Sequence, residues 1–387
     1  MQPDRWFAVG SAQGTGRGSG ARALDDALQS GDPKLVLVFC SPSQNLPELL
    51  REIRSRSAGA PLIGCTTGGE IATAGPHDAS VVVAVFGGPG FAIQTAVATH
   101  ASQDLRRAGA LVAQCVPDRP DLPHRVLLLL SDGLAGDQQE LVRGAYGVLG
   151  AAVPLVGGCA GDDLKMATTF QLYGDRVLTD AVVAAGIASD APLGIGVHHG
   201  WRRVGEPMLV TASAGNRVFT LDDRPAIDVY LDHLGLDEPT GSDQEWLARI
   251  ALTHPLGLRR ASGEDHVRFI TGGDFSERSL SCAAEVSNGA LVWIMEGDAK
   301  SVLEATDTAC RGSLAALDGQ APLGMLAFDC IARRGVLGSA GIRTEIERIA
   351  TIASGAPVAG FYTYGEIARV RGLHGFHNQT LVVLAVA

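Results

Sequence analysis

Short apolar runs alternate along this chain with stretches in which apolar residues recur at helical spacing. Residues 35–39, 126–130 and 323–328 are almost continuously apolar, which is typical of strands covered on both faces of a sheet. Each run is followed by apolar residues at positions i, i+3, i+4 and i+7, the spacing of a helix that lies on a sheet. The pattern predicts three strand–helix pairs, and we expect all three runs to be nearly inaccessible to solvent.

A short repeat follows the three predicted helices. The segments 61–71, 154–164 and 357–367 read PLIGCTTGGEI, PLVGGCAGDDL and PVAGFYTYGEI, and they align without gaps. The alignment places Gly64, Gly157 and Gly360 at equivalent positions. A strand–helix–strand unit of this length has parallel strands joined by a crossover. The sequence therefore predicts an α/β fold in which repeated β-α-β units form mixed sheets with helices packed on their faces.

The remaining pattern divides the chain into two domains. A hairpin within 169–178, turning at Gly174 and Asp175, is interpreted as an insertion in the second copy. Strands, a helix entered at Pro225 and further strands separate the second copy from the third. We place the domain boundary near residue 215, which gives an N-terminal domain of residues 1–215 and a C-terminal domain of residues 216–387.

Composition and charge narrow the class of protein. The net charge of −11 argues against nucleic acid and against an anionic membrane surface, because both partners need a basic face. Seven scattered cysteines without C-x-x-C spacing indicate a reducing compartment. We find neither an apolar run of about 18 residues nor the apolar stretch of a signal peptide. We therefore expect a cytoplasmic protein.

Polar residues gather where the predicted parallel strands end, and such loop tips are where α/β proteins bind ligands. One set follows the first strand of each copy and consists of Ser41, Asp132 and Asp329. The other set lies in the repeated turn and consists of Thr67, Glu70, Asp162, Asp163, Thr363 and Glu366. Such hydroxyl and carboxylate groups can hold an ammonium, hydroxyl or amide group. In the alternative interpretation, glycines form the turn and the acidic side chains cap backbone N–H groups.

The third copy resembles a binding site most, because aromatic residues join the polar ones. Tyr362 and Tyr364 flank the turn that holds Glu366. We expect a pocket lined by these three residues, with His374 or His377 nearby from the loop 369–377. In a competing interpretation, the tyrosine rings pack into the core and only their hydroxyl groups reach polar partners.

Other motifs give weaker signals. The Gly-rich loop 14–20 precedes a helix, the context of a phosphate site, but it does not fit G-x-G-x-x-G, and a flexible entry to the helix is the better interpretation. No serine lies in G-x-S-x-G, and H-E-x-x-H is absent. The sequence thus offers no recognisable catalytic motif.

The order of these segments resembles the FIST family of signal-transduction proteins. LVLVFCSPSQNLPELLREIRSRSAGAPLIGCTTGGEI and PLVGGCAGDD resemble its N-terminal domain, whereas AFDCIARR, AGFYTYGEIARV and FHNQTLVVLAV resemble its C-terminal domain. The resemblance implies a sensory module for amino-acid-like small molecules. Some family members bind haem and report nitric oxide to a partner histidine kinase. If haem binds here, its candidate iron ligands are His198, His199, His374 and His377.

Three functions stay open at this point. The first is a small-molecule sensor that signals through a separate partner, and the second is a haem-based nitric-oxide sensor. The third is an enzyme of undescribed type, which needs a cleft that pairs a nucleophile with a base. The sequence leaves a homo-oligomeric state open.

Overall fold

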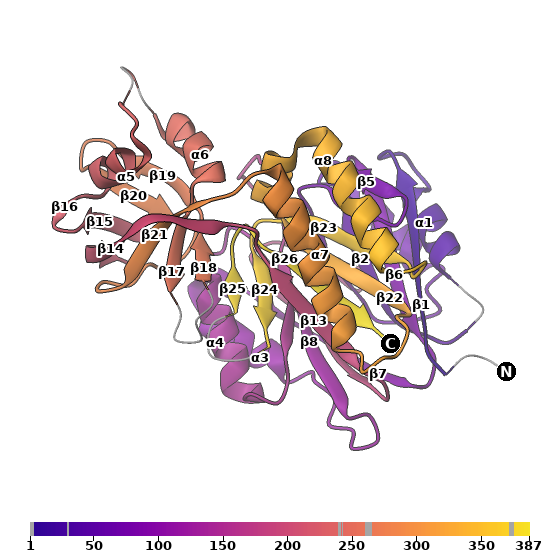
Figure 1. Ribbon diagram of the computed structural model, residues 1–387. Helices are drawn as coiled ribbons and strands as arrows, with labels where there is room; N and C mark the ends of the chain where they lie inside the picture. Colours follow the sequence, from indigo (N-terminus) through magenta and orange to yellow (C-terminus); the bar gives the residue numbers. More distant parts are fainter. Residues whose placement is uncertain (1–3, 29–30, 239–240, 242, 260–264, 371–374) are drawn as a thin grey trace.

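The computed structural model describes residues 4–28, 31–238, 241, 243–259, 265–370 and 375–387. Within these residues the chain is a mixed α/β protein with eight α-helices and four sheets (Figure 1). The predicted fold class is confirmed. Within those residues, no helix combines the length and the hydropathy that a membrane span requires.

Most of the chain runs three times through one order of elements: strand, helix, strand, helix, strand, hairpin, strand. We call these stretches unit 1 (6–87), unit 2 (91–189) and unit 3 (193–198 together with 299–386). Unit 1 consists of β1 (Trp6–Gln13), α1 (Ser19–Ala27), β2 (Pro33–Cys40), α2 (Leu46–Arg54), β3 (Leu62–Thr66), β4 (Glu70–Ala72), β5 (Gly75–His77) and β6 (Ser80–Gly87). Unit 2 consists of β7 (Phe91–Thr99), α3 (Leu105–Ala113), β8 (His124–Ser131), α4 (Gln138–Leu149), β9 (Leu155–Cys159), β10 (Gln171–Tyr173), β11 (Arg176–Leu178) and β12 (Ala181–Ser189).

Unit 3 is interrupted after its first strand by residues 202–296, which we call the inserted region. The unit consists of β13 (Leu193–His198), α7 (Ala299–Ala315), β22 (Gly324–Cys330), α8 (Ile331–Ile352), β23 (Val358–Thr363), β24 (Glu366–Arg369), β25 (Phe376–His377) and β26 (Leu381–Val386). The inserted region consists of β14 (Arg202–Ala214), β15 (Arg217–Leu221), β16 (Arg224–Pro225), α5 (Ala226–Leu234), α6 (Gln244–Thr253), β17 (Leu256–Arg259), β18 (Asp265–Arg268), β19 (Ile270–Asp274), β20 (Ser279–Cys282) and β21 (Leu291–Glu296). Its strands form a sheet of their own, beside the three units in Figure 1.

Each unit completes its sheet with a hairpin from another unit. The strand orders are β1-β6-β2-β3-β10-β11, β7-β12-β8-β9-β24-β25 and β13-β26-β22-β23-β4-β5. Unit 1 thus receives the hairpin of unit 2, unit 2 receives that of unit 3, and unit 3 receives that of unit 1. The hairpin predicted within 169–178 is present as β10–β11, but its interpretation as an insertion is wrong. Units 1 and 3 contain the equivalent hairpins β4–β5 and β24–β25.

The three repeat glycines occupy the same place in this pairing. Gly64, Gly157 and Gly360 each lie in the second parallel strand of their sheet, opposite Val38, Leu129 and Ala327 of the first. A Cβ atom added to them would lie only 2.2, 2.0 and 1.8 Å from the carbonyl oxygens of these partners. Only glycine allows this close approach of two backbones.

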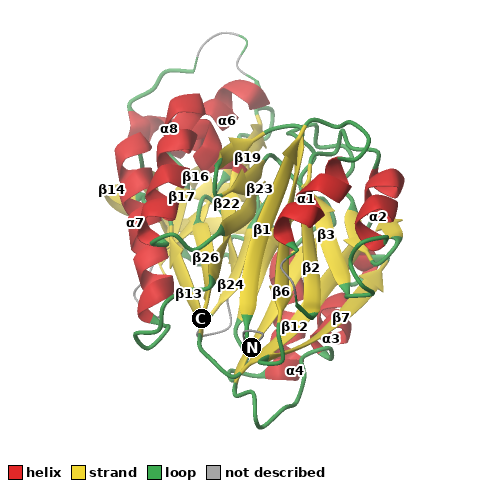
Figure 2. Cartoon of the chain, turned by 90° about the vertical axis from the view of Figure 1, so that its right-hand side faces the viewer, coloured by secondary structure: helices red, strands yellow, loops and turns green. Residues whose placement is uncertain are grey.

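The sheets share one core. Alternate residues of the first parallel strands, such as Leu37, Leu128 and Leu326, point into a single cluster that all three sheets line. The opposite faces are covered by α1 and α2, by α3 and α4, and by α7 and α8, which lie outside the strands in Figure 2. The predicted burial of 35–39, 126–130 and 323–328 is confirmed, except that Leu323 is half-buried.

The inserted region lies on the path of the chain between β13 and α7. The expected domain boundary near residue 215 falls in the turn between β14 and β15, inside the sheet of this region. On the N-terminal side of that turn, β13 pairs with β26 at the end of the chain. One sheet of unit 3 therefore contains strands from both halves of the sequence.

The close backbone approach yields a test of the fold. We expect Gly64→Ala and Gly360→Ala each to lower the free energy of unfolding by about 1–3 kcal/mol or more, because the added methyl group overlaps a strand carbonyl oxygen. Gly147→Ala in α4 is the control, since its Cβ meets no atom within 4 Å and alanine favours a helix. Urea denaturation monitored by circular dichroism measures all three. Equal effects for the strand and helix variants would contradict the close approach.

Candidate functional site

The three repeated turns meet at one end of the shared core. Backbone bonds link each turn to another unit: Tyr362 N donates to Gly69 O (2.9 Å), Gly161 N to Thr66 O (2.9 Å), and Cys159 N to Gly365 O (2.8 Å). The carboxyl ends of all the parallel strands therefore lie together. The structure thus brings the sequence candidates to one region, although their side chains point in different directions.

Two of the candidate carboxylates have parallel contacts in units 1 and 3. Thr67 donates its hydroxyl proton to Glu70 (2.5 Å), and Thr363 donates likewise to Glu366 (2.6 Å). The second carboxylate oxygen accepts from the backbone N–H of Ser80 or Thr380, each at 3.1 Å. Both glutamates are fully buried. Their hydrogen bonds fix the backbone at the start of the last strand of each unit, β6 or β26, which we call the closing strand.

In unit 2 the equivalent residue is Gln171, and the alignment of Asp163 with Glu70 and Glu366 is wrong. Gln171 pairs with Cys65 in the register in which Glu366 pairs with Gly158, and its Oε1 accepts from Ala181 N (3.3 Å). Asp163 lies instead in a longer loop, with a φ of 56°. The gapless alignment fails here because unit 2 contains extra residues between its turn and its hairpin.

A one-residue shift also affects the first set of candidates. In the strand pairing, Ser41 and Asp132 correspond to Cys330, because each of the three donates its N–H to a carbonyl oxygen at the start of the closing strand: Ser80, Ala181 and Thr380. Asp329 corresponds to Cys40 and Ser131 at the end of the strand itself. The side chain of Asp329 consequently lies on the outer face of its sheet, under α8.

Asp162 and Tyr364 hold the longer loop of unit 2. The Tyr364 hydroxyl donates to the Asp162 carboxylate and accepts from Leu164 N at 2.7 Å. The same carboxylate accepts from the backbone N–H groups of Met166, Ala167 and Thr168 at 2.7–3.0 Å. Burial opposes ionisation of Asp162, but these hydrogen bonds lower its pKa below the usual value. Such contacts are those of a loop-capping carboxylate.

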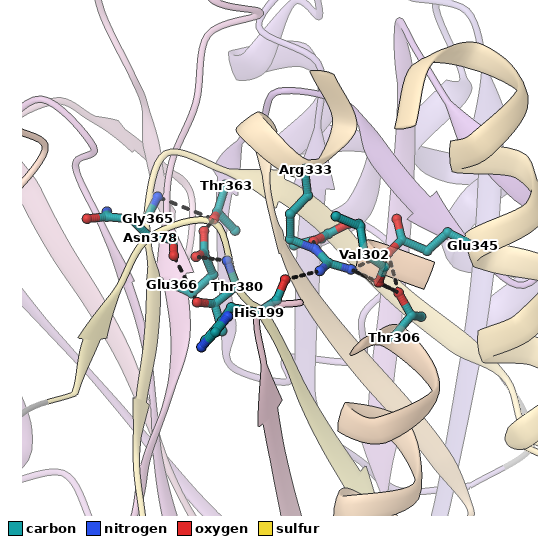
Figure 3. Close-up of polar contacts among 11 residues, drawn as sticks. His199, Val302, Thr306, Arg333, Glu345, Thr363, Gly365, Glu366, Asn378 and Thr380 are labelled. Atoms are coloured by element: carbon teal, nitrogen blue, oxygen red, sulfur yellow. Dashed lines mark hydrogen bonds and ion pairs between the residues drawn. The ribbon is translucent and has the colours of Figure 1, made fainter. Parts of the chain in front are cut away.

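A buried ionic cluster lies at the end of unit 3, between its sheet and the helices α7 and α8. Arg333 donates to Asp329 Oδ1 (2.6 Å), to Glu345 Oε1 (2.6 Å) and to Thr306 Oγ1 (2.9 Å). It also donates to the carbonyl oxygens of His199 (3.1 Å) and Val302 (3.3 Å) (Figure 3). All four residues of the cluster are buried, with at most 1% of their surface exposed.

Tyr362 belongs to this cluster and not to the turn of Glu366. It pairs with Asp329 across the parallel strands, so both side chains leave the sheet on the face that α8 covers. Its ring lies 5.0 Å from the Arg334 guanidinium. Figure 3 shows Glu366, Thr363 and Thr380 grouped apart from Arg333, Glu345 and Thr306. Tyr362, Tyr364 and Glu366 therefore face three different surroundings.

Four buried side-chain atoms at this end have no hydrogen-bond partner within the part of the chain that the structure describes. They are Asp329 Oδ2, Tyr362 OH, Asn378 Oδ1 and Gln379 Oε1. We call the six residues Asp329, Arg333, Glu345, Tyr362, Asn378 and Gln379 the unit 3 end. Unpartnered buried polar atoms are rare in proteins, and each calls for an explanation such as a bound water, an ion or a functional role.

The comparisons with known proteins agree with the order of the segments. The FIST N domain matches residues 34–224, and the FIST C domain matches residues 226–369. The chain belongs to the FIST family.

Chains similar to this one occur in several microorganisms. An uncharacterized protein of Mycobacterium tuberculosis is 28% identical over 364 residues, which cover 91% of each chain. Uncharacterized proteins of Mycobacterium bovis (27% identity, 58% of each chain) and Methanocaldococcus jannaschii (25% identity, 38% of this chain and 30% of that one) are also similar. Among solved structures, a cyanuric acid hydrolase from A. caulinodans aligns over 99% of this chain and 100% of its own, at 11% identity and a TM-score of 0.33. A similarity this weak carries no inference.

Burial controls the charge state of the carboxyl groups in this FIST protein. It raises the pKa of Glu70 to about 7 and that of Glu366 to about 8, although hydrogen bonds from Thr67, Ser80 and Thr363 act in the opposite direction. Burial, followed by the neighbouring Glu345, also raises the pKa of Asp329 well above its usual value. For Arg333 burial alone would lower the pKa, but Asp329 and Glu345 more than offset it.

The histidines proposed as iron ligands have other partners. His377 Nε2 lies 2.9 Å from Ala368 O, and its ring packs on His266 with centroids 4.8 Å apart. His199 Nδ1 accepts from Trp201 N at 3.0 Å, and burial lowers its pKa to about 4. His198 is exposed at the end of β13, and His374 lies outside the described residues, as do residues 371–373 of the loop 369–377. No contact singles out one imidazole, so haem stays a prediction from the resemblance.

The backbone N–H groups of the Gly-rich loop before α1 already bind a carboxylate group of the protein, that of Glu52. Gly18 N donates to Glu52 Oε1 (2.6 Å) and Gly20 N to Glu52 Oε2 (3.1 Å). These amide groups are the donors that a phosphate would need.

Sequence reasoning missed four residues of the unit 3 end. Arg333, Asn378 and Gln379 lie inside AFDCIARR and FHNQTLVVLAV, two segments that carried the family resemblance. Glu345 stands on the apolar stripe that Ile342, Ile346 and Ile349 form. A carboxylate on the buried face of an amphipathic helix needs a buried partner, and that signal was available in the sequence.

The pKa values of the buried glutamates predict a pH-dependent stability. Between about pH 4.5 and pH 8 the unfolded chain loses the Glu366 proton while the folded chain keeps it, so stability falls as pH rises, by up to about 1.4 kcal/mol per pH unit. Glu366→Gln removes this contribution, and glutamine already serves at the equivalent position of unit 2. Urea denaturation at several pH values should show Glu366→Gln gaining stability relative to the wild type up to pH 8. A constant difference would refute the raised pKa.

The ionic cluster predicts unequal roles for two neighbouring arginines. Arg333→Met leaves two buried carboxyl groups without their cation, and we expect a loss of about 3–5 kcal/mol in the free energy of unfolding. Arg334→Met breaks an ion pair with Asp78, whose side chain is 67% exposed, and should cost about 1 kcal/mol or less. Chemical denaturation of both variants measures the difference. Similar losses would contradict the structural role of the buried cluster.

Proposed function

We propose that this FIST protein is a sensory protein that binds a small amino-acid-like molecule at the unit 3 end and signals through a separate protein. FIST domains are associated with signal transduction and small-ligand sensing. The observation that supports this site is the gathering of four unpartnered buried polar atoms at one of three equivalent strand ends. A partner such as a histidine kinase is what the family resemblance implies.

Units 1 and 2 provide the comparison. At the position of Asp329, Ser131 of unit 2 donates to Gln138 at 2.5 Å, and at the position of Tyr362, Thr66 of unit 1 accepts from Phe170 N at 3.0 Å. At the position of Gln379, Asp180 of unit 2 accepts from Ser102 at 2.7 and 2.9 Å. The equivalent polar groups of the other units are thus satisfied within the protein. Unit 3 departs from this rule, and a departure at one of several equivalent places indicates function.

The chemistry of the free atoms indicates the kind of ligand. Asn378 Oδ1 and Gln379 Oε1 only accept hydrogen bonds, and so does an ionised Asp329. A ligand that satisfies them carries N–H or O–H donors, as an amino acid or a related amine does. The site also adjoins the inserted region, because Gln379 Nε2 donates to Leu252 O at 2.8 Å. A ligand there contacts both parts of the chain, and this provides a route for a signal.

The experiment is a binding screen with a matched pair of variants. We expect at least one of the twenty amino acids or simple primary amines to raise the melting temperature of the full chain and to bind in isothermal titration calorimetry. Gln379→Ala should weaken that binding about tenfold, the equivalent of one hydrogen bond of about 1.4 kcal/mol. Asp180→Ala, at the equivalent position of unit 2, should leave the affinity unchanged.

Two outcomes would contradict the proposal. If no compound of the screen binds, the sensory assignment loses its support. If Asp180→Ala weakens binding as much as Gln379→Ala does, the ligand does not lie at the unit 3 end.

A further inference from the structure

The ionic cluster of the unit 3 end holds two carboxyl groups against one guanidinium group. Asp329, Glu345 and Arg333 are 1%, 1% and 0% exposed. With both carboxyl groups ionised, the cluster carries one net negative charge away from water, which costs several kilocalories per mole. The buried cluster therefore needs one further positive charge.

The surrounding groups do not supply that charge. From the linker after β13, His199 is neutral because burial and His198 lower its pKa to about 4. From α7, Cys310 is a neutral thiol because burial and Glu345 raise its pKa to about 12. From α8, the Arg334 guanidinium binds Asp78 and the Gly68 carbonyl.

The remaining neighbours lie in the sheet, and they are neutral or acidic. Tyr362 of β23 is a neutral phenol, since burial, Glu345 and Asp329 raise its pKa. Cys330 of β22 is a neutral thiol, because burial and Glu366 raise its pKa. Glu366 of β24 has a carboxyl group, which cannot supply a positive charge. The charge of the cluster is thus balanced by a proton, and Asp329 is the group whose surroundings favour the protonated form.

Tyr362 gives an independent indication of a ligand. Its hydroxyl group is buried and has no hydrogen-bond partner in the described chain, and the carboxyl groups of Glu345 and Asp329 are close enough to raise its pKa. Asp329 Oδ2 receives no hydrogen bond from a donor in the described chain, and the Asp329 and Glu345 carboxyl groups lie close enough to share a proton. Three acceptors of one cluster, the Asp329 and Glu345 carboxylates and the Tyr362 oxygen, match the three N–H donors of a primary ammonium group.

We propose that this cluster is the cation subsite of the unit 3 end and takes the ammonium group of the ligand in exchange for the proton of Asp329. The inference rests on the proposed function and adds the ligand's charge and the site of the exchange. One R–NH₃⁺ enters, the O–H bond of the Asp329 carboxyl group breaks, and one H⁺ leaves to solvent, so the net charge is unchanged. The Arg334 guanidinium lies over the Tyr362 ring, and its side chain is 24% exposed.

Methylammonium chloride is the probe that tests the exchange, and tetramethylammonium chloride is its control, because the latter carries the same charge but no N–H donor. Calorimetry of the full chain in phosphate and in HEPES, neither of which is a primary amine, gives the number of protons released, since the two buffers differ in ionisation enthalpy. We expect methylammonium to bind with release of about one proton and with a Kd that falls as pH rises, as long as the free cluster holds the proton of Asp329. Tetramethylammonium should not bind.

Variants locate the exchanging group. Asp329→Asn can still accept from Arg333 Nε through its amide oxygen, and it should lose both methylammonium binding and proton release. Ser131→Ala, at the equivalent position of unit 2, should change neither. Should Asp329→Asn fail to fold, Tyr362→Phe keeps the ring and removes one acceptor. That variant should weaken binding about fivefold with the proton release retained.

The outcomes separate this inference from the proposed function. If amino acids bind to the wild type but methylammonium does not, or binds without proton release, the cation exchange is wrong and the sensory function stands. Binding of tetramethylammonium with equal affinity would likewise overturn the exchange. If neither amino acids nor amines bind, the proposed function fails as well.

Discussion

Backbone pairing between the units is the interaction on which the rest of this structure depends. Each unit gives its hairpin to another sheet, and no unit closes its own. The N–H and C=O groups of β3, β9 and β23 would otherwise form open edges, which proteins avoid. The closed exchange joins the inner faces of three sheets into one core and brings the carboxyl ends of their parallel strands together.

The same backbone frame carries different side chains in the three units. A residue with a left-handed backbone precedes each closing strand: Ala79, Asp180 and Gln379 have φ values of 52°, 48° and 54°. Ala79 has only a methyl side chain. Asp180 accepts a hydrogen bond from Ser102 of its own unit, and Gln379 donates one to Leu252 of the inserted region. Equivalent geometry with unequal chemistry is what allows one strand end to differ in function from the other two.

Unit 3 differs most because the inserted region covers its end. Leu252 of α6 lies against Gly335 of α8, where a Cβ atom would be 3.1 Å from the leucine side chain. Two residues earlier in α8, Arg333 enters the ionic cluster, and Glu345 reaches it from beyond the break in the helix at Gly338. The inserted region, the kinked helix and the buried charges are therefore in direct contact.

The sequence by itself determined the elements and the kind of fold. Its apolar runs located β2, β8 and β22, and its prolines and glycines located the second parallel strands, because buried strands and close backbone approach restrict which residues fit. The short hairpins β4–β5 and β24–β25 were not recognisable, since two to four residues per strand give too little alternation to detect. The turn residues were found as a set, but one copy was misaligned at Asp163.

Only the tertiary structure decided what the polar residues do. Tyr362, Tyr364 and Glu366 are close in sequence, yet they face α8, the loop of unit 2 and the start of β26. Arg333, Glu345 and Asp329 form one cluster because α8 folds back over the strand that precedes it. Whether a buried polar atom has a partner depends on residues more than a hundred positions away, as the bond between Gln379 and Leu252 shows. Local sequence fixes backbone preference, but the partners of buried charges are set by packing between distant segments.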